Sequence, residues 1–375
     1  MAQVSRRSFL AGASAAAFAA SRFSMASPRR ERVFIASGSP DGILAYDWDR
    51  SGADLAAAGV AAHISTIDWV AFSPDRKYIY AASEVESFNG KPTGAVASFR
   101  FANGKLEQIS AQNSASKGTC HCAVDRTGRV LVAADYGGGS AASFRITDGA
   151  LSPLVWSEHY TERGPDKNRQ EAAHAHFASF SPDGRFTYVN DLGGDCIHIY
   201  HVNTETAVLT AAGKYRSLPG AGPRTLHFHP NGRTAYSMNE MASTVDVLDW
   251  HKSDGQLTRV TSVALLPEGY HGATRGCDTV ITRDGRFVYF ANRDNNFLYS
   301  FSCDAQTGAL TPIARSNCGG KTPRNFTLDP TECWMLVANQ DSNVISVFAR
   351  DPATGKLADE GNSYAATAPM CILFA

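Results

Sequence analysis

The feature that most constrains the fold is a motif that recurs six times along the chain. An alternating apolar run leads into a turn such as Ser-Pro-Asp-Gly-Arg, and an aromatic or aliphatic run follows it. The copies cover 72–83, 124–135, 180–191, 228–239, 281–292 and 328–339, and their turn positions (74, 126, 182, 230, 283 and 330) lie 47–56 residues apart. A third run and then a fourth follow in the repeats. Four short strands in a repeat of this length are typical of a β-propeller blade.

A seventh blade is predicted to be divided between the two ends of the chain. Residues 32–37 (RVFIAS) match the second run of a blade, and residues 368–374 align with 222–228, the first run of another blade. Pairing of the 369–375 strand with the 32–38 strand would close the ring and leave no exposed sheet edge. The sequence therefore predicts an all-β fold, a seven-bladed β-propeller, with one domain over 27–375.

The first 26 residues are predicted to be a signal peptide rather than part of the fold. Arg6-Arg7 with Phe9-Leu10, followed by the Ala-rich stretch 11–20, resembles a twin-arginine export signal. Either 24–26 or 17–19 offers small residues for cleavage; the alternative is an uncleaved, disordered N-terminus. We therefore expect a periplasmic or secreted protein. Beyond this segment no apolar run approaches the roughly 20 residues of a membrane span.

Charge and cysteine content exclude several classes of protein. Lys and Arg number 35 against 36 Asp and Glu, a formal net charge of −1, which excludes a polybasic nucleic-acid binder. The eight cysteines form no Cys-x-x-Cys pair and are too sparse for a disulfide scaffold, so most are expected to be buried thiols. We expect a monomer without nucleic-acid partners.

Ionisable residues are predicted to gather at one mouth of the propeller channel. If each hairpin is centred on its turn Gly, the residue six before the turn position lies opposite the residue ten after it. The first set lines the channel as an inner ring: Asp68, Cys120, His176, Arg224, Cys277, Arg324 and Met370. Their predicted partners are Glu84, Tyr136, Leu192, Glu240, Arg293, Gln340 and Gly38.

Equivalent positions in a repeat would look alike if packing alone selected them, but these differ and many are charged. Three arginines, a histidine and a glutamate at one mouth favour a pocket for an anionic or hydroxyl-rich small molecule. The alternative is a water-filled polar channel whose charges only solvate it. No aromatic platform stands at these positions, so a single-stranded nucleic acid is not expected.

Two other patterns carry little weight. The segment 319–322 (GGKT) resembles the end of a phosphate-binding loop, but Arg315 replaces its first Gly and Pro323 follows it. His174-x-His176 places two imidazoles on one face of a strand, but no third ligand has a clear spacing. We therefore expect neither a metal nor a cofactor.

The segment 157–173 is the longest insertion between blades. It carries Arg163, Lys167 and Arg169 and runs directly into His174 and His176. Loops of this length are often functional, so we expect it to overhang the charged mouth. The alternative is a solvated insertion.

Several of these motifs together resemble the seven-bladed propeller lactonases, which include propeller-type 6-phosphogluconolactonases and fungal carboxymuconate cyclases. The resemblance covers roughly 31–375. Departures are Ala173 in place of a usual Pro, Ala134 in place of a frequent Asn, and 331–334 in place of the usual turn. The matching segments are 169–176 leading into 180–186, 222–232, 238–240, 291–293, 321–325 and 337–341.

The resemblance implies hydrolysis of a sugar-acid lactone and places the family's proposed active-site residues on His176, Arg224, Glu240 and Arg293. Lactone hydrolysis needs an activated water and a stabilised oxyanion. Glu240 or His176 is then the candidate base beside Arg224, and Arg293 and Arg324 would grip the substrate. Further candidate substrate-binding residues are His174, Glu84, Asp68 and Gln340. Two alternatives remain open: a carboxymuconate-type lactonising or cycloisomerising enzyme, and a non-enzymatic exported ligand-binding propeller.

Overall fold

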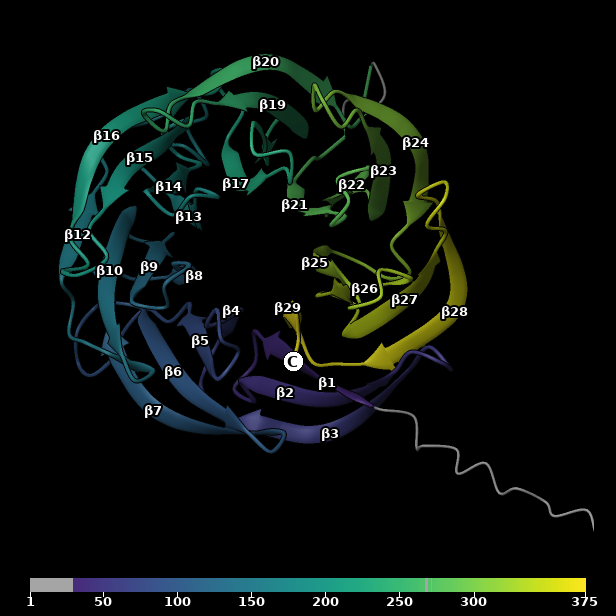
Figure 1. Cartoon of the computed structure of the whole chain (residues 1–375), viewed down its shortest axis with the longest axis horizontal. Helices are drawn as coiled ribbons and strands as arrows, with labels where there is room; N and C mark the ends of the chain where they lie inside the picture. The colour runs from purple at the N-terminus through teal and green to yellow at the C-terminus, as the bar shows by residue number, and fades with distance from the viewer. Residues whose placement is uncertain (1–29, 267–268, 271) are drawn as a thin grey trace, which may run out of the picture.

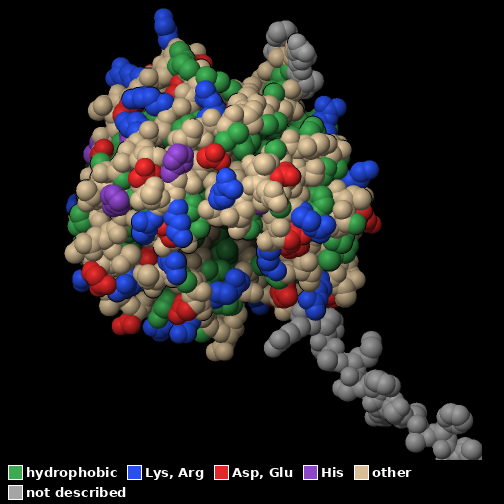
Figure 2. Space-filling view, turned by 45° about the horizontal axis from the view of Figure 1, so that its top comes forward, with side chains coloured by type: hydrophobic (Ala, Val, Ile, Leu, Met, Phe, Trp, Pro, Cys, Tyr) green, Lys and Arg blue, Asp and Glu red, His purple; other side chains and the backbone are tan. Residues whose placement is uncertain are grey.

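Seven β-sheets surround a central channel in the computed structural model, which describes residues 30–266, 269–270 and 272–375 (Figure 1). The described residues form strands and turns, with no helix long and apolar enough to cross a membrane. Each sheet is a blade whose first strand lies innermost (Figure 1). One face of the molecule is hollowed near its centre (Figure 2). The predicted signal segment and the start of the predicted domain lie outside the described residues.

The blades are numbered here in chain order. Blade 1 contains β29 (Pro369–Phe374), β1 (Glu31–Ser37), β2 (Ile43–Asp49) and β3 (Asp54–Ala62). Blade 2 contains β4 (Ile67–Phe72), β5 (Tyr78–Ser83), β6 (Ala95–Ala102) and β7 (Lys105–Asn113). Blade 3 contains β8 (Thr119–Val124), β9 (Val130–Asp135), β10 (Ser140–Thr147), β11 (Ala150–Leu151) and β12 (Trp156–His159). Blade 4 contains β13 (Ala175–Phe180), β14 (Phe186–Asp191), β15 (Cys196–Val202) and β16 (Leu209–Arg216).

The remaining blades follow the same order. Blade 5 contains β17 (Pro223–Phe228), β18 (Thr234–Asn239), β19 (Thr244–Trp250) and β20 (Leu257–Ala264). Blade 6 contains β21 (Gly276–Ile281), β22 (Phe287–Asn292), β23 (Phe297–Cys303) and β24 (Leu310–Asn317). Blade 7 contains β25 (Pro323–Leu328), β26 (Trp334–Asn339), β27 (Val344–Arg350) and β28 (Leu357–Ala365).

The recurring turn motif folds because its side chains satisfy the turn's own backbone. In blade 4 the Ser181 hydroxyl accepts a hydrogen bond from the Phe186 amide at 3.0 Å and donates one to Asp183 at 2.7 Å. Gly184 has a φ of 75°, a left-handed conformation that glycine adopts without strain. In blade 7 Glu332 holds the same position at 58°, so the departure at 331–334 keeps the turn.

The predicted ring closure is confirmed. β29 pairs antiparallel with β1, and the register runs from Val33 opposite Phe374 to Ser37 opposite Pro369. The C-terminal strand is therefore the innermost strand of blade 1, beside β1 (Figure 1). Its Ile372 packs in an apolar cluster that combines residues of blades 1 and 7.

The predicted hairpin register is wrong: the ladder next to the turn is displaced by one residue, and a β-bulge in each innermost strand displaces it by one more. In blade 5 Pro223 lies opposite Asn239 and Thr225 lies opposite Met238, so Arg224 between them has no partner. A bulged residue stays outside the ladder, and its side chain is re-aimed. The other inner-ring residues lie at the same irregularity in their blades: Asp68, Cys120, His176, Cys277, Arg324 and Met370.

The predicted partners of the inner-ring residues lie at the same mouth, and a backbone hydrogen bond outside the ladder holds each of them there. Each follows the second strand of its blade and donates its amide N–H to a carbonyl before the first strand. The Glu240 amide, for example, donates to Gly222 at 2.7 Å, two residues before Arg224. Glu240 thus lies opposite Gly222 instead of Arg224, a shift of two residues to which the bulge contributes one, and both side chains stay at one end of the channel.

Blade 3 departs from the common pattern at its outer edge. β10 pairs with both β11 and β12, which together take the place of a fourth strand. The predicted insertion 157–173 consequently begins within β12, and the connection to blade 4 is 160–174.

Among the described cysteines all eight are free, and six are buried, as expected from the sequence.

Because β29 closes the ring, we expect the apolar contacts of this strand to contribute strongly to the free energy of unfolding. Ile372→Ala should lower the free energy of unfolding by about 2–5 kcal/mol, the usual cost of a large-to-small change in a packed core. Val260→Ala on β20, where the side chain is 58% exposed, is the matched control and should stay within about 0.5 kcal/mol. Urea unfolding measures both. Deleting 369–375 opens the ring, and an unchanged Tm for that truncated protein would contradict the closure.

Candidate active site

One mouth of the channel contains a polar pocket of about 140 Å³. It is lined by Glu84, Tyr136, Arg169, His176, Arg224, Glu240, Arg293 and Arg324. Six of these are sequence-predicted site residues. They come from the bulge of an innermost strand or from the residue that follows a second strand. The bulges and the shared amide bond therefore bring residues from several blades to one place.

Glu240 is the centre of the pocket's charge cluster. Its carboxylate Oε2 contacts Arg224 Nη1 at 2.5 Å and Arg293 Nη2 at 2.6 Å, and its Oε1 accepts from Arg169 Nη2 at 2.6 Å. The Glu240 side chain is 1% exposed. Burial alone would raise the pKa of this carboxyl, but Arg293 and Arg224 hold it well below its usual range. Glu240 is consequently an ionised anchor for three guanidinium groups.

His176 lies beside this cluster as a neutral imidazole. Its Nε2 faces Arg224 Nη1, which is a donor, so Nε2 accepts and the proton is assigned to Nδ1. Nδ1 has no hydrogen-bond partner among the described residues. Burial and the charge of Arg224 lower the pKa of His176 well below its usual value. The ring also meets Tyr136 edge-on at 5.5 Å between centroids.

Arg324 and Glu84 form the other side of the pocket. Arg324 Nη2 binds both carboxylate oxygens of Asp68, at 2.8 and 2.9 Å. Although burial opposes it, Asp68 and Glu84 raise the pKa of Arg324. Glu84 makes no side-chain hydrogen bond or ion pair within 30–266, 269–270 and 272–375. Burial and the neighbouring Asp68 raise the pKa of Glu84 to about 7, against the opposing charges of Arg324 and Arg224.

Three predicted site residues lie outside the pocket lining. Asp68 lies deeper, where the channel narrows to a cavity of about 20 Å³, room for about one water molecule. His174 stacks on Tyr136 at 4.5 Å, and its Nδ1 contacts the Tyr136 carbonyl at 3.0 Å. Gln340 is half-buried beyond β26.

The connection 160–174 contributes one side chain, Arg169, to the lining of this mouth, and its overhang stays a prediction. Arg169 reaches into the pocket and contacts both Glu240 and the Tyr136 hydroxyl, the latter at 3.3 Å. Gln170 anchors the connection, because its Nε2 donates to Leu192 at 2.9 Å and to Asp195 at 2.7 Å. Sequence reasoning placed Tyr136 in the ring and Arg169 in the insertion next to His174, but it assigned neither of them to the site.

The arrangement suits chemistry on an oxygen-rich anion. Four guanidinium groups surround a pocket in which one carboxylate already holds three of them. Fixed cations that need not reorient can stabilise negative charge that develops on a bound carbonyl oxygen. The unpaired carboxyl of Glu84 is free to exchange a proton.

Comparison with known proteins points to one family. A family model described as "Lactonase, 7-bladed beta-propeller" matches residues 32–374. A 6-phosphogluconolactonase of Bacillus subtilis is 30% identical over 340 residues, which cover 90% of this chain and 95% of that protein. A 6-phosphogluconolactonase of Formosa agariphila is 30% identical over 324 residues, 84% of this chain and 90% of that one. The structure of a Pseudomonas aeruginosa periplasmic gluconolactonase superposes with a TM-score of 0.86 and 30% identity, covering 92% of this chain and 99% of that one.

The charge cluster predicts a large stability effect at Glu240. Glu240→Gln leaves buried guanidinium groups without their counterion, so the free energy of unfolding at pH 7 should fall by about 3–5 kcal/mol. The exposed pair Arg100–Glu107, 3.6 Å apart, is the control, and Glu107→Gln should cost at most about 1 kcal/mol. Because the folded-state pKa of Glu240 is depressed, its contribution is present above about pH 4.5 and is lost as the pH falls further. Equal effects of the two substitutions in urea titrations would refute this account.

Proposed function

We propose, from the premise that this chain belongs to the seven-bladed β-propeller lactonase family, that it hydrolyses a sugar-acid lactone at the arginine-rich mouth. The observation that carries the proposal is the pocket itself: four guanidinium groups and a neutral imidazole converge on about 140 Å³. The relatives named 6-phosphogluconolactonase and gluconolactonase support a 6-phosphogluconolactone-like or gluconolactone-like substrate.

The excess of positive charge supports an anionic or hydroxyl-rich ring. Arg224 and Arg293, both held by Glu240, would face the lactone carbonyl and stabilise the oxyanion. Arg324, fixed by Asp68 on the opposite side, would bind the substrate's phosphate or hydroxyl groups. Orientation of these cations before the substrate arrives lowers the reorganisation that the reaction requires.

We assign activation of water to Glu84. Glu240 and His176 were the two candidates from sequence, but the pKa of each is well below its usual value, which makes both weak bases. Glu84 lines the same pocket, pairs with no arginine among the residues that the structure describes, and has a pKa of about 7. A general base is most effective when its pKa lies near the working pH.

The proposed reaction conserves atoms and charge. The Glu84 carboxylate takes a proton from water as the water oxygen bonds to the lactone carbonyl carbon. The resulting oxyanion rests against Arg224 and Arg293. When the ring C–O bond breaks, Glu84 returns its proton to the departing alkoxide, and the open-chain sugar acid is released.

We also propose that the protein acts outside the cytoplasm. The Arg6-Arg7 segment supports export, and the similar Pseudomonas aeruginosa gluconolactonase is named as periplasmic. An unphosphorylated lactone fits that compartment better than a phosphorylated metabolite.

Incubation of the purified protein with gluconolactone, its 6-phosphate and a muconate distinguishes hydrolysis from cycloisomerisation. Turnover of none of them favours a ligand-binding protein.

Replacement of Glu84 should remove one limb of the pH profile. In the wild type kcat/KM should rise with pH through about 7, because the base must be deprotonated. Glu84→Gln should lower kcat by on the order of 10²–10⁴ and abolish that limb. His176→Gln, the matched pocket variant, should also lower kcat but keep the limb. A Glu84→Gln enzyme with near-normal kcat and an unchanged limb would rule out this assignment.

Arg324 should act on binding rather than on chemistry. Because Arg324→Met alone would leave Asp68 buried and unpaired, the test uses the double variant Arg324→Met/Asp68→Asn. KM should rise about 10- to 100-fold, the usual loss for a charge-assisted hydrogen bond, while kcat changes little. Steady-state kinetics should show a larger rise for the 6-phosphate than for gluconolactone if Arg324 binds the phosphate. A fall in kcat at constant KM would contradict a binding role.

A further inference from the structure

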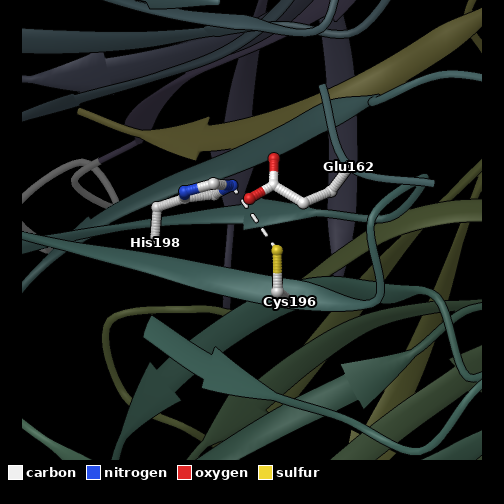
Figure 3. A group of neighbouring side chains, drawn as sticks. All are labelled: Glu162, Cys196 and His198. Carbon is white, nitrogen blue, oxygen red and sulfur yellow. Dashed lines mark hydrogen bonds between the residues drawn. The ribbon is translucent and has the colours of Figure 1, made fainter. Parts of the chain in front are cut away.

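A second cluster of ligating side chains lies in blade 4, outside the pocket. Glu162, Cys196 and His198 each offer one ligand atom, and these atoms lie within 4.8 Å of one another. Figure 3 shows the three side chains pointing toward a common centre. Cys196 and His198 are two residues apart on β15 and therefore share a face of the sheet. Glu162 comes from the connection 160–174.

Asp191 supplies an independent sign that a cation belongs here. It lies directly opposite Cys196 in the β14–β15 pair, and it is fully buried. Its Oδ1 accepts from the amides of His174 and Gly194, at 2.7 and 3.0 Å. Its Oδ2 has no hydrogen-bond partner in the described part of the chain and lies 3.8 Å from His198 Nε2. A buried carboxylate oxygen without a partner is costly, and a bound cation would compensate it.

The spacing fits zinc. With Zn–S of about 2.3 Å and Zn–N of about 2.0–2.1 Å, a tetrahedral angle places the two ligand atoms about 3.5 Å apart. Cys196 Sγ and His198 Nε2 are 3.5 Å apart. One thiolate, one imidazole and one carboxylate form a ligand set that suits zinc better than magnesium or calcium. We propose that Cys196, His198 and Glu162 bind a Zn²⁺ ion, with the buried carboxylate of Asp191 next to His198 as a further negative charge beside it.

Two neighbouring side chains bear on this site. Tyr160 stacks on the His198 ring at 3.7 Å with an interplanar angle of 11°, which fixes the direction of Nε2. Lys214 Nζ pairs with Glu162 and is partly exposed. The Lys214 ammonium therefore competes with the ion for Glu162 and repels it. Zinc binding requires the ammonium to turn toward solvent.

The site would connect the segment 160–174 to the sheet. Glu162 and Arg169 lie in the same connection, and Arg169 contacts Glu240 in the pocket. A zinc ion held by Glu162 and by β15 would thus fix the segment that carries Arg169. Its role is structural, because none of its ligands lines the pocket. The inference does not depend on the reaction proposed above.

The test is metal analysis of the full chain, followed by Co²⁺ substitution. The purified protein should contain about one equivalent of zinc by mass spectrometry. After chelation, Co²⁺ should give a thiolate-to-cobalt charge-transfer band and the d–d bands of a tetrahedral site. Cys196→Ser should abolish the charge-transfer band, and His198→Gln should lower zinc affinity at least about 10-fold. Cys333→Ser, which removes an exposed thiol outside the cluster, is the matched control and should change neither.

Lys214→Met provides a variant that gains rather than loses binding. Removal of a positive charge next to the site should tighten zinc at least about fivefold in isothermal titration. Zinc affinity should also fall at lower pH, since the thiol must lose its proton. Failure of the wild type to bind zinc or Co²⁺ at millimolar concentration overturns the proposal. So does a charge-transfer band that persists in Cys196→Ser but disappears in Cys333→Ser.

Discussion

The β-bulge in the innermost strand of each blade is the constraint on which the site depends. A regular ladder would direct alternate side chains into the packing between blades, where charged groups are costly. The bulge takes one residue per blade out of that alternation, as with Arg224 between Pro223 and Thr225. Because closure by β29 arranges seven such strands in a ring, the freed side chains meet at one mouth. The charged pocket is thus built by repetition, with each blade free to supply a different residue.

Once gathered, the charges determine one another's chemistry. Glu240 balances guanidinium groups that could not be buried alone, and its depressed pKa is the consequence. Burial and the neighbouring Asp68 move the pKa of Glu84 the opposite way, and no arginine in the described part of the chain binds its carboxyl group. Two glutamates in one pocket thereby have different tasks, one as fixed counterion and one as a group that can exchange protons near neutrality. Their environments, rather than their identities, separate the two roles.

Sequence reasoning reached the architecture but not the local geometry. The spaced turn motif predicted the blades, and the alignment of 368–374 with 222–228 predicted the closure, because both follow from the repeat. The bulges were not predicted, because the pairing arithmetic assumed a regular ladder from the turn to the mouth. Predicted partners such as Glu240 nevertheless lie at the mouth, because the shift by two residues is the same in every blade. His174 falls outside the pocket lining because its ring stacks on Tyr136, a contact between distant residues that the repeat does not specify.

The contacts of the connection 160–174 could not be predicted from the sequence either. Its length and charge drew attention to it, but its action depends on contacts distant in sequence. Gln170 binds Asp195, and Asp195 Oδ1 also accepts the Gly222 amide at 2.8 Å, just before the bulge that carries Arg224. Asp191 joins the proposed zinc cluster to the start of β13 through the His174 amide. The connection 160–174 is therefore held at the pocket through Arg169 and lies at the cluster through Glu162. Substitutions in blade 4 can then shift Arg169 without altering the reacting groups.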